Sequence, residues 1–288
     1  MNLQNSPVEK IQFNDYEYFI KRDDLLNKDF SGNKARKFYY YLINDFPNIK
    51  KIVSYGSAQS NAMYSLSVLS KLKSWSFEYY VDHVPTYLKE NPAGNYKEAL
   101  NNEAKIIEQK VPSKFDDETL FISEGGAVNE AKVGIEKLAN EIKSWAEKND
   151  IKNLKVFLPS GTGTTALFLQ KYLPFEVLTC ACVGDETYLQ KQFELLEKDN
   201  FPTILKREKK YHFGKLYKEF YEVHHELLNQ TNIEFDLLYD SLGWIVFQNY
   251  LKENYDKNYK YMYIHQGGIL GNISMLQRYK YKYKIPLN

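Results

Sequence analysis

The sequence has little cysteine: among its 288 residues only Cys180 and Cys182 carry thiols. They stand two residues apart in a stretch that we predict to be one buried strand, and such neighbours have poor disulfide geometry. A secreted scaffold held by disulfides is therefore excluded, and a reducing compartment is expected. The first residues, MNLQNSPVEKIQFND, show no apolar core of the kind that secretory signal peptides carry. We expect a cytoplasmic protein.

An excess of one charge and long apolar runs are missing too. The 38 lysines and arginines nearly balance the 37 aspartates and glutamates, so the formal net charge is +1. This balance favours neither a nucleic acid nor an anionic membrane as partner, despite the basic Tyr/Lys run Arg278–Lys284. No apolar run approaches the ~20 residues of a membrane span. No two histidines have the spacing of a helical metal site, so no metal is expected.

What the sequence does contain is an alternation of apolar runs and helical patterns. The stretches KVFLP, VLTCACV and YMYIH are continuously apolar, as parallel strands buried on both faces are. Strand–helix repetition with short connections predicts an α/β fold with mostly parallel sheets and helices on both faces. The predicted strands cover 50–56, 76–81, a short segment ending within 121–124, 154–159, 175–183, 235–238 and 261–265. The predicted helices cover 60–72, 92–104, 129–149, 164–173, 186–197, 215–229, 242–255 and a last segment from about 270.

The run SGTGTT at 160–165 lies between a predicted strand and an apolar helix. Small residues let the backbone approach an anion, and a helix N-terminus adds free N–H groups and a positive dipole end. The run is not a Walker A loop, because no lysine follows the last glycine, and the glycine spacing is not that of a dinucleotide fingerprint. It suits a phosphate monoester held by neutral donors without a cation; a plain glycine-rich turn is the alternative.

Two further motifs stand at predicted helix starts. Ser31 and Gly32 look like the beginning of a helix, which places Lys34 in the first turn, where the dipole disfavours its ammonium form. A lowered pKa would make the Lys34 amine a better Schiff-base nucleophile, although an ordinary surface lysine is the alternative. The segment YGSAQSN, Tyr55–Asn61, offers hydroxyl and amide groups at a helix start, either as a carboxylate seat or as a simple N-cap.

Together, these motifs are the parts that a pyridoxal 5′-phosphate (PLP) enzyme of amino-acid metabolism needs. From about Lys21 to Gly268 the chain carries, in order, KRDDL…SGNKARK, GSAQSNA, ISEGG, LPSGTGTT, LLYD and IHQGG. This series resembles the 1-aminocyclopropane-1-carboxylate (ACC) deaminase and D-cysteine desulfhydrase family, which has the tryptophan-synthase-β-like fold (fold type II). The resemblance implies a homodimer of two-domain subunits. The large PLP-binding domain would comprise 1–46 plus 128–288, with a small domain, 47–127, inserted.

The resemblance also implies roles for single residues. Lys34 matches the Schiff-base lysine, which moves the proton at the substrate Cα. Ser60 matches the serine beside the substrate carboxylate, with Gln59 as its neighbour, and Tyr239 matches a tyrosine that faces the substrate. Asp240 stands where ACC deaminases carry a glutamate that pairs with the pyridine nitrogen. The other matched cofactor contacts are Asn61, for the phenolic oxygen, and Gly161, Thr162, Gly163, Thr164 and Thr165, for the phosphate.

The positions that would read the substrate match neither subfamily. Gln266, a candidate substrate contact, stands where ACC deaminases have leucine and desulfhydrases have threonine. Either Phe213 or the nearby Tyr211 falls at a second active-site tyrosine, and Ala62 replaces an amide residue. These departures favour β-elimination from a small D-amino acid such as D-cysteine, with a keto acid and ammonia as products. ACC ring opening to 2-oxobutanoate remains open because of the Asp240 carboxylate, as does PLP binding without this activity.

Overall fold

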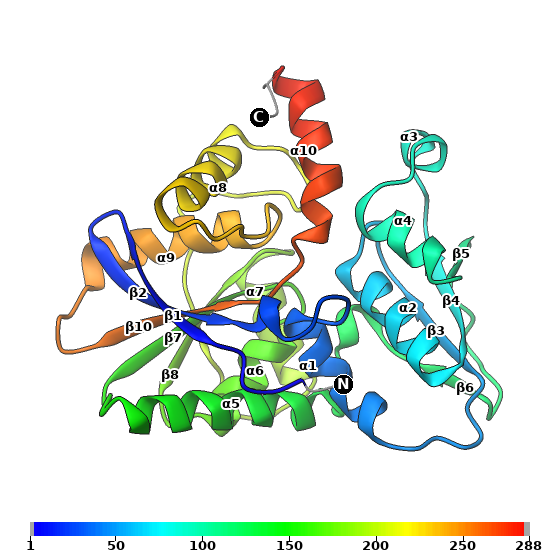
Figure 1. Cartoon of the computed structure of the whole chain (residues 1–288), viewed down its shortest axis with the longest axis horizontal. Helices are drawn as coiled ribbons and strands as arrows, with labels where there is room; N and C mark the ends of the chain where they lie inside the picture. The colour runs from blue at the N-terminus through cyan, green and yellow to red at the C-terminus, as the bar shows by residue number, and fades with distance from the viewer. Residues whose placement is uncertain (1–2, 285–288) are drawn as a thin grey trace.

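The computed structural model describes residues 3–284 and contains two β-sheets that lie next to each other (Figure 1). The larger sheet has six strands in the order β1-β2-β10-β7-β8-β9, and the smaller has four in the order β5-β4-β3-β6. The α/β class and the mostly parallel sheets that the sequence predicts are confirmed. The strands of the larger sheet, in chain order, are β1 (Val8–Phe13), β2 (Tyr16–Arg22), β7 (Leu154–Ser160), β8 (Glu176–Ala181), β9 (Thr203–Ile204) and β10 (Lys260–His265).

The larger sheet combines one antiparallel hairpin with parallel strands. The hairpin β1–β2 is not among the predicted strands; it pairs Val8 with Lys21 and Phe13 with Tyr16. Strand β2 then runs parallel to β10, and β10 runs parallel to β7. The carboxyl ends of β2, β10, β7 and β8 consequently meet at one edge, which is where open parallel sheets bind ligands.

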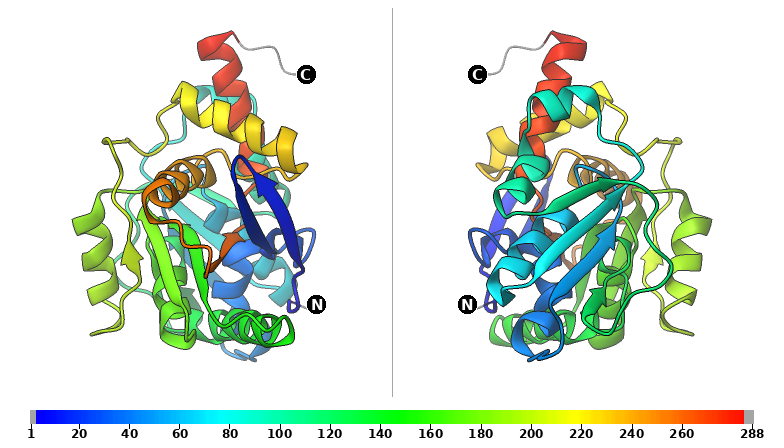
Figure 2. Two further views of the ribbon diagram at one scale, coloured as in Figure 1. Left: turned by 90° about the vertical axis from the view of Figure 1, so that its left-hand side faces the viewer. Right: turned by 90° about the vertical axis from the view of Figure 1, so that its right-hand side faces the viewer.

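Helices cover both faces of the larger sheet, as the apolar strand patterns predict (Figure 2). Buried side chains of α5, α6 and α7 form one core with the sheet, and those of α8, α9 and α10 form the other. Both faces of strands such as β7 are therefore apolar. The helices are α5 (Ala131–Lys148), α6 (Thr164–Tyr172), α7 (Glu186–Glu194), α8 (Lys218–Thr231), α9 (Asp240–Asn254) and α10 (Leu270–Tyr283).

The smaller sheet is wholly parallel and packs against α2. Its strands all fall inside the segment 47–127, while the division of the chain at 46 and 128 stays a prediction. Helix α1 contacts both α2 and α5, so it connects the smaller sheet's core with the larger sheet's helices. These elements are β3 (Lys51–Tyr55), β4 (Ser76–Val81), β5 (Lys105–Glu108), β6 (Thr119–Phe121), α1 (Gly32–Ile43), α2 (Asn61–Lys73), α3 (Thr86–Glu90), α4 (Gly94–Asn101) and the short 3₁₀ turns η1 (Asp23–Leu25) and η2 (Glu124–Gly126).

The strand predicted at 235–238 is wrong, because this segment is a turn that leads into α9. Side chains take the backbone N–H groups that a strand would give to its neighbours. The Asp236 carboxylate accepts from Leu238 N at 2.9 Å, and the Asn272 amide oxygen accepts from Leu237 N at 2.8 Å. The apolar letters of this segment reflect burial in the core rather than pairing in a sheet.

Between residues 3 and 284, no helix is long and apolar enough to cross a membrane. Within the same range, no group of histidine, cysteine and acidic side chains has an arrangement that could hold a metal ion.

Candidate active site

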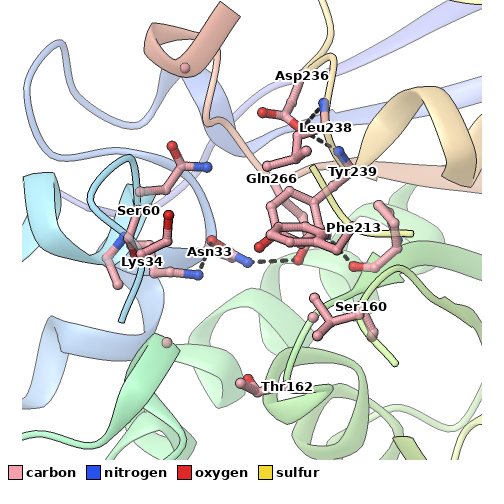
Figure 3. A pocket seen from close by; sticks show the side chains of 18 of the residues that line it. Asn33, Lys34, Ser60, Ser160, Thr162, Phe213, Asp236, Leu238, Tyr239 and Gln266 are labelled. Carbon is pink, nitrogen blue, oxygen red and sulfur yellow. Dashed lines mark hydrogen bonds between the residues drawn. The ribbon is translucent and has the colours of Figure 1, made fainter. Parts of the chain in front are cut away.

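A cavity of about 410 Å³ opens at the carboxyl edge of the larger sheet (Figure 3). Its lining residues come from the loops and helix starts next to both sheets. This volume is typical of pockets for small molecules and cofactors. The residues to which the sequence analysis gives a catalytic, cofactor-binding or substrate-binding role line it, as does Phe213, whereas Tyr211 does not. The residues with these roles are Lys34, Gln59, Ser60, Asn61, Gly161, Thr162, Gly163, Thr164, Thr165, Tyr239, Asp240 and Gln266.

The start of α1 brings Lys34 to the cavity. Gly32 has a φ of +64°, and a Cβ there would lie 1.9 Å from the Gln266 carbonyl oxygen, so only glycine permits this approach. Asn33 N donates to the same carbonyl at 3.0 Å and fixes the first turn of the helix. Burial lowers the pKa of Lys34 from its usual 10.5 to about 8, against an opposing effect of Asp236. A neutral, nucleophilic amine is accordingly accessible near neutral pH.

The loop after β7 has the form of a phosphate cup. Gly163 has a φ of +74° and precedes α6, whose first residues, Thr164 and Thr165, line the cavity. The first N–H groups of a helix have no partner within the helix. The hydroxyls of Thr162 and Thr164 lie 3.1 Å apart. The Thr165 hydroxyl is buried and has no hydrogen-bond partner among the described residues. A buried hydroxyl without a partner is costly, and an anion in the cup would satisfy it.

A lysine side chain, Lys37, lies beside this cup, where the sequence analysis expects only neutral donors; which groups would hold a phosphate stays a prediction. Lys37 is 3 % exposed, and its side-chain amino group donates to Gly125 O at 3.0 Å and to the Thr162 hydroxyl at 3.3 Å. Burial lowers its pKa, and nearby Lys34 lowers it further. One sequence signal was available: Lys37 follows Lys34 by three residues and therefore shares its helix face. The fold brings that face to a loop far away in the sequence.

The opposite wall is formed by the start of α2. Ser60 caps this helix, because its hydroxyl oxygen accepts from Ala62 N at 3.1 Å, which leaves the hydroxyl proton available to a ligand. Asn61 presents its amide oxygen to Asn95 Nδ2 at 2.6 Å, and Asn95 also donates to Gln59 O at 3.0 Å. The Asn61 NH₂ group therefore remains the free donor. Asn95 comes from α4 and belongs to no sequence motif, so sequence reasoning missed it.

The turn before α9 places two buried carboxylates beside the cavity. Asp236 accepts from the backbone N–H groups of Leu238 and Tyr239, and Asp240 accepts from Asp236 N at 3.1 Å and from the Tyr263 hydroxyl at 2.8 Å. Burial raises the pKa of both carboxyls, and Asp236 raises that of Asp240 further. Burial and the Asp236 carboxylate raise the pKa of Tyr239, whose hydroxyl stays protonated at neutral pH. Sequence reasoning named Asp240 but missed Asp236.

An aromatic side chain, Phe213, stands beside Tyr239 at the cavity. Phe213 lines the cavity, and its ring centroid lies 5.2 Å from that of Tyr239. Tyr211 does not line the cavity and packs its ring against those of Tyr217 and Phe220, each 5.0 Å away. The structure thus puts Phe213, which lacks a hydroxyl, at the site (Figure 3).

Gln266 connects two walls through its side-chain amide. Its oxygen accepts from Asn33 Nδ2 at 3.0 Å, and its nitrogen donates to Pro159 O at 2.7 Å. Both ends of the amide are engaged, so Gln266 holds the start of α1 against the end of β7. Its predicted role as a substrate contact stays a prediction.

Neighbouring His265 has a structural environment. The side chain is fully buried, stacks on Phe235, and accepts from Gly267 N through Nδ1. Its Nε2 lies 2.8 Å from Glu234 O and donates to it, because Nδ1 is the acceptor. Neither ring nitrogen is free for a ligand.

No protein-family model matches the sequence, and a search of curated proteins finds no match. Solved structures do match. One described as an ACC deaminase homologue superimposes with a TM-score of 0.77 at 18 % identity, covering 96 % of this chain and 94 % of that one. A hydrogen sulfide-producing enzyme from Fusobacterium nucleatum matches at 0.65 and 14 %, covering 92 % and 94 %. A pyridoxal 5′-phosphate-dependent aspartate racemase matches at 0.60 and 12 %, covering 91 % and 90 %. The chain therefore has the two-sheet α/β fold of the fold type II enzymes.

Proposed function

We propose that this chain binds PLP and uses it to deprotonate a small amino acid at Cα and eliminate its β-substituent, with D-cysteine as the type substrate. The observation that carries the proposal is the convergence of Lys34 and a phosphate cup bordered by the Lys37 amino group on one cavity. The unpartnered Thr165 hydroxyl in that cup supports the fit of a phosphate group. The likeness to PLP-dependent enzymes of the same fold supports the choice of cofactor.

The residues present suit each part of the cofactor. Residues 161–165 and Lys37 would hold the phosphate, and the free Asn61 NH₂ group would donate to the phenolic oxygen. Asp240 retains lone pairs on both carboxylate oxygens and would face the pyridine nitrogen. Lys34 would attach to the aldehyde. When bound, PLP supplies an electron sink for the charge left at Cα.

The side chains of this protein then handle the substrate. Ser60 and the N-terminus of α2 would bind the substrate carboxylate. The Lys34 amine, with its pKa near 8, would accept the Cα proton and stay close enough to return it. Tyr239 would donate from its protonated hydroxyl to the departing group. The β-substituent leaves with its bonding electrons, and addition of water with release of ammonia gives the keto acid.

ACC ring opening is the second candidate. It is favoured by the buried Asp240 carboxylate at the cavity, since ACC deaminases carry a carboxylate at this position. The phenyl ring of Phe213 in place of a tyrosine speaks against it. PLP binding without turnover is the third candidate. The homodimer remains a prediction from the resemblance alone.

The visible absorption spectrum of the purified protein with PLP tests the proposal. We expect a yellow band that is absent in Lys34→Ala, and release of sulfide and pyruvate when D-cysteine is added. A response to ACC alone, with 2-oxobutanoate as product, would support ring opening instead. A band without turnover on either compound would leave a PLP-binding protein, and no Lys34-dependent band would sink the proposal.

A further inference from the structure

Helix α10 forms one wall of the cavity and carries an unexplained arginine. Gly271, Ser274, Met275 and Arg278 all line the cavity, and their spacing puts them on one face of the helix. A Cβ on Gly271 would lie 3.7 Å from the Asn61 amide oxygen, so this end of α10 reaches the inner part of the site. Arg278 stands seven residues further along, about 10 Å by the helical rise. The basic run at the end of the sequence thus begins inside the cavity wall.

The guanidinium group of Arg278 is held in place by neutral groups. Nη2 donates to Gly214 O at 2.8 Å, and Nη1 lies 3.1 Å from the Met275 sulfur. Gly214 follows Phe213, whose ring contacts Tyr239, so the guanidinium lies on the wall that continues outward from these rings. Arg278 is half-buried, and side chains on a helix lean towards its N-terminus, which here points into the site.

The charge of Arg278 has no partner within residues 3–284, and this distinguishes it from the other arginines of the chain. Arg22 pairs with Asp24, Arg36 with Asp23, and Arg207 with Glu186. Arg278 forms no ion pair with any described residue. A fixed, half-buried guanidinium with unused donors in the wall of a cavity has the geometry and charge to bind a carboxylate, phosphate or sulfonate.

We infer that Arg278 binds a second anionic group, so that small amino acids whose side chain ends in an anion bind this site more tightly than uncharged ones of the same shape. The inference rests on the proposed function, because it takes the inner part of the cavity to hold the amino acid's own carboxylate and reacting carbon. The distance along α10, shortened by the inward lean of Arg278, leaves room for a side chain of a few bonds. Gly214 O and Met275 keep the guanidinium oriented before any ligand arrives.

Matched pairs of ligands test this inference in the PLP-loaded protein. Both enantiomers of aspartate and glutamate are titrated against asparagine and glutamine, which have nearly the same shape without the charge, and the shift of the visible band gives each Kd. We expect the acids to bind about tenfold more tightly than their amides, the effect of one charge-assisted contact. Arg278→Met should abolish the preference, and Arg278→Lys should retain part of it.

Lys280→Met is the matched control, since Lys280 is an exposed cation on another side of the same helix. It should keep the full preference. Equal binding of acids and amides by the wild-type protein overturns the inference, as does an Arg278→Met variant that weakens both alike. These outcomes leave the Lys34-dependent band intact, whereas failure of the proposed function removes that band in the wild-type protein before any ligand is added.

Discussion

The two faces of helix α1 both carry basic side chains, but only one face pairs them with carboxylates. On one face, Arg36 donates to Asp23 at 2.8 and 3.0 Å and to Glu141 at 2.7 and 2.8 Å, and all three side chains are nearly buried. On the other face, Lys34 and Lys37 border the cavity and form no ion pair with any residue in the range 3–284. Carboxylates neutralise the basic side chain on the paired face, that of Arg36, whereas the basic side chains on the unpaired face, those of Lys34 and Lys37, have no such partner in the described part of the chain.

The acid–base properties of the two faces differ accordingly. Burial lowers the pKa of Arg36, but Asp23 and Glu141 outweigh that effect, so the pKa is raised overall. Burial lowers the pKa of Lys34 and of Lys37; the Asp236 carboxylate opposes this effect at Lys34 but does not outweigh it, and none of the described carboxylates opposes it at Lys37. Carboxylate partners, rather than burial alone, therefore decide whether a buried basic side chain stays charged or becomes a neutral amine. We infer that Arg36 positions the helix and that the lysines use that position.

The largest effect is expected for Lys34→Ala. Without the amine there is no covalent attachment of PLP and no base at Cα, so turnover of D-cysteine should fall by about a thousandfold or more. The band of the bound cofactor should disappear, and borohydride should no longer fix it to the protein. Lys148→Ala removes an exposed lysine and is the control. A Lys34→Ala variant that still turns over at roughly a tenth of the normal rate would assign the chemistry to Lys37 instead.

Removing the ion pairs of Arg36 should lower the free energy of unfolding. Arg36→Met leaves the carboxylates of Asp23 and Glu141 without their main partner in the interior, at a cost of about 3–5 kcal/mol. For a chain of this size that lowers the melting temperature by roughly 6–20 °C. Arg36→Lys keeps the charge but loses the forked geometry of the guanidinium group, so its melting temperature should lie between those of Arg36→Met and the wild-type protein. A shift below about 2 °C in Arg36→Met would show that the buried cluster does not hold α1.

Lys37→Met should weaken the grip on the phosphate. A charge-assisted hydrogen bond contributes about 1.5–3 kcal/mol, so the affinity for PLP should fall roughly 10- to 150-fold. Pyridoxal, which has no phosphate, should bind the variant and the wild-type protein equally well. Equal losses for both compounds would mean that Lys37 supports the fold of the cup rather than the anion.

The sequence predicts those parts of the site whose chemistry is local. The phosphate loop, the serine cap of α2 and Lys34 each lie at one strand–helix or loop–helix junction, so neighbouring residues reveal them. Asn95 and Arg278 could not be predicted, because their neighbours at the cavity come from elements remote in the chain. Lys37 shares a helix face with Lys34, but the loop that this face meets is equally remote in the chain. The wrong strand at 235–238 has the same origin: its apolar letters show burial, but not that side chains cap its N–H groups.

The lowered pKa of Lys34, on the face of α1 without ion pairs, can be tested through its effect on pH-dependent measurements. With a pKa of about 8 in the folded protein against 10.5 in an unfolded chain, the amine is largely neutral above pH 8. The rate of band formation on adding PLP should rise with pH and level off around that value. Between these two pKa values the unfolded chain binds more protons, so the free energy of unfolding gains from Lys34 as the pH rises. Lys34→Met should lack this gain. A rate that still rises steeply beyond about pH 10 would contradict the lowered pKa.

The smallest effect is expected where the two faces of α1 are anchored to the sheet. Gln266→Leu places there the residue that ACC deaminases carry, and it leaves Asn33 Nδ2 and Pro159 O without their partner. Loss of these bonds should cost about 1–2 kcal/mol and lower the melting temperature by a few degrees. Because both ends of the amide are engaged within the protein, KM should change by less than about threefold, as a positioning residue requires. A roughly tenfold rise in KM at an unchanged melting temperature would instead make Gln266 a substrate contact, in addition to the residues of α1 that line the cavity.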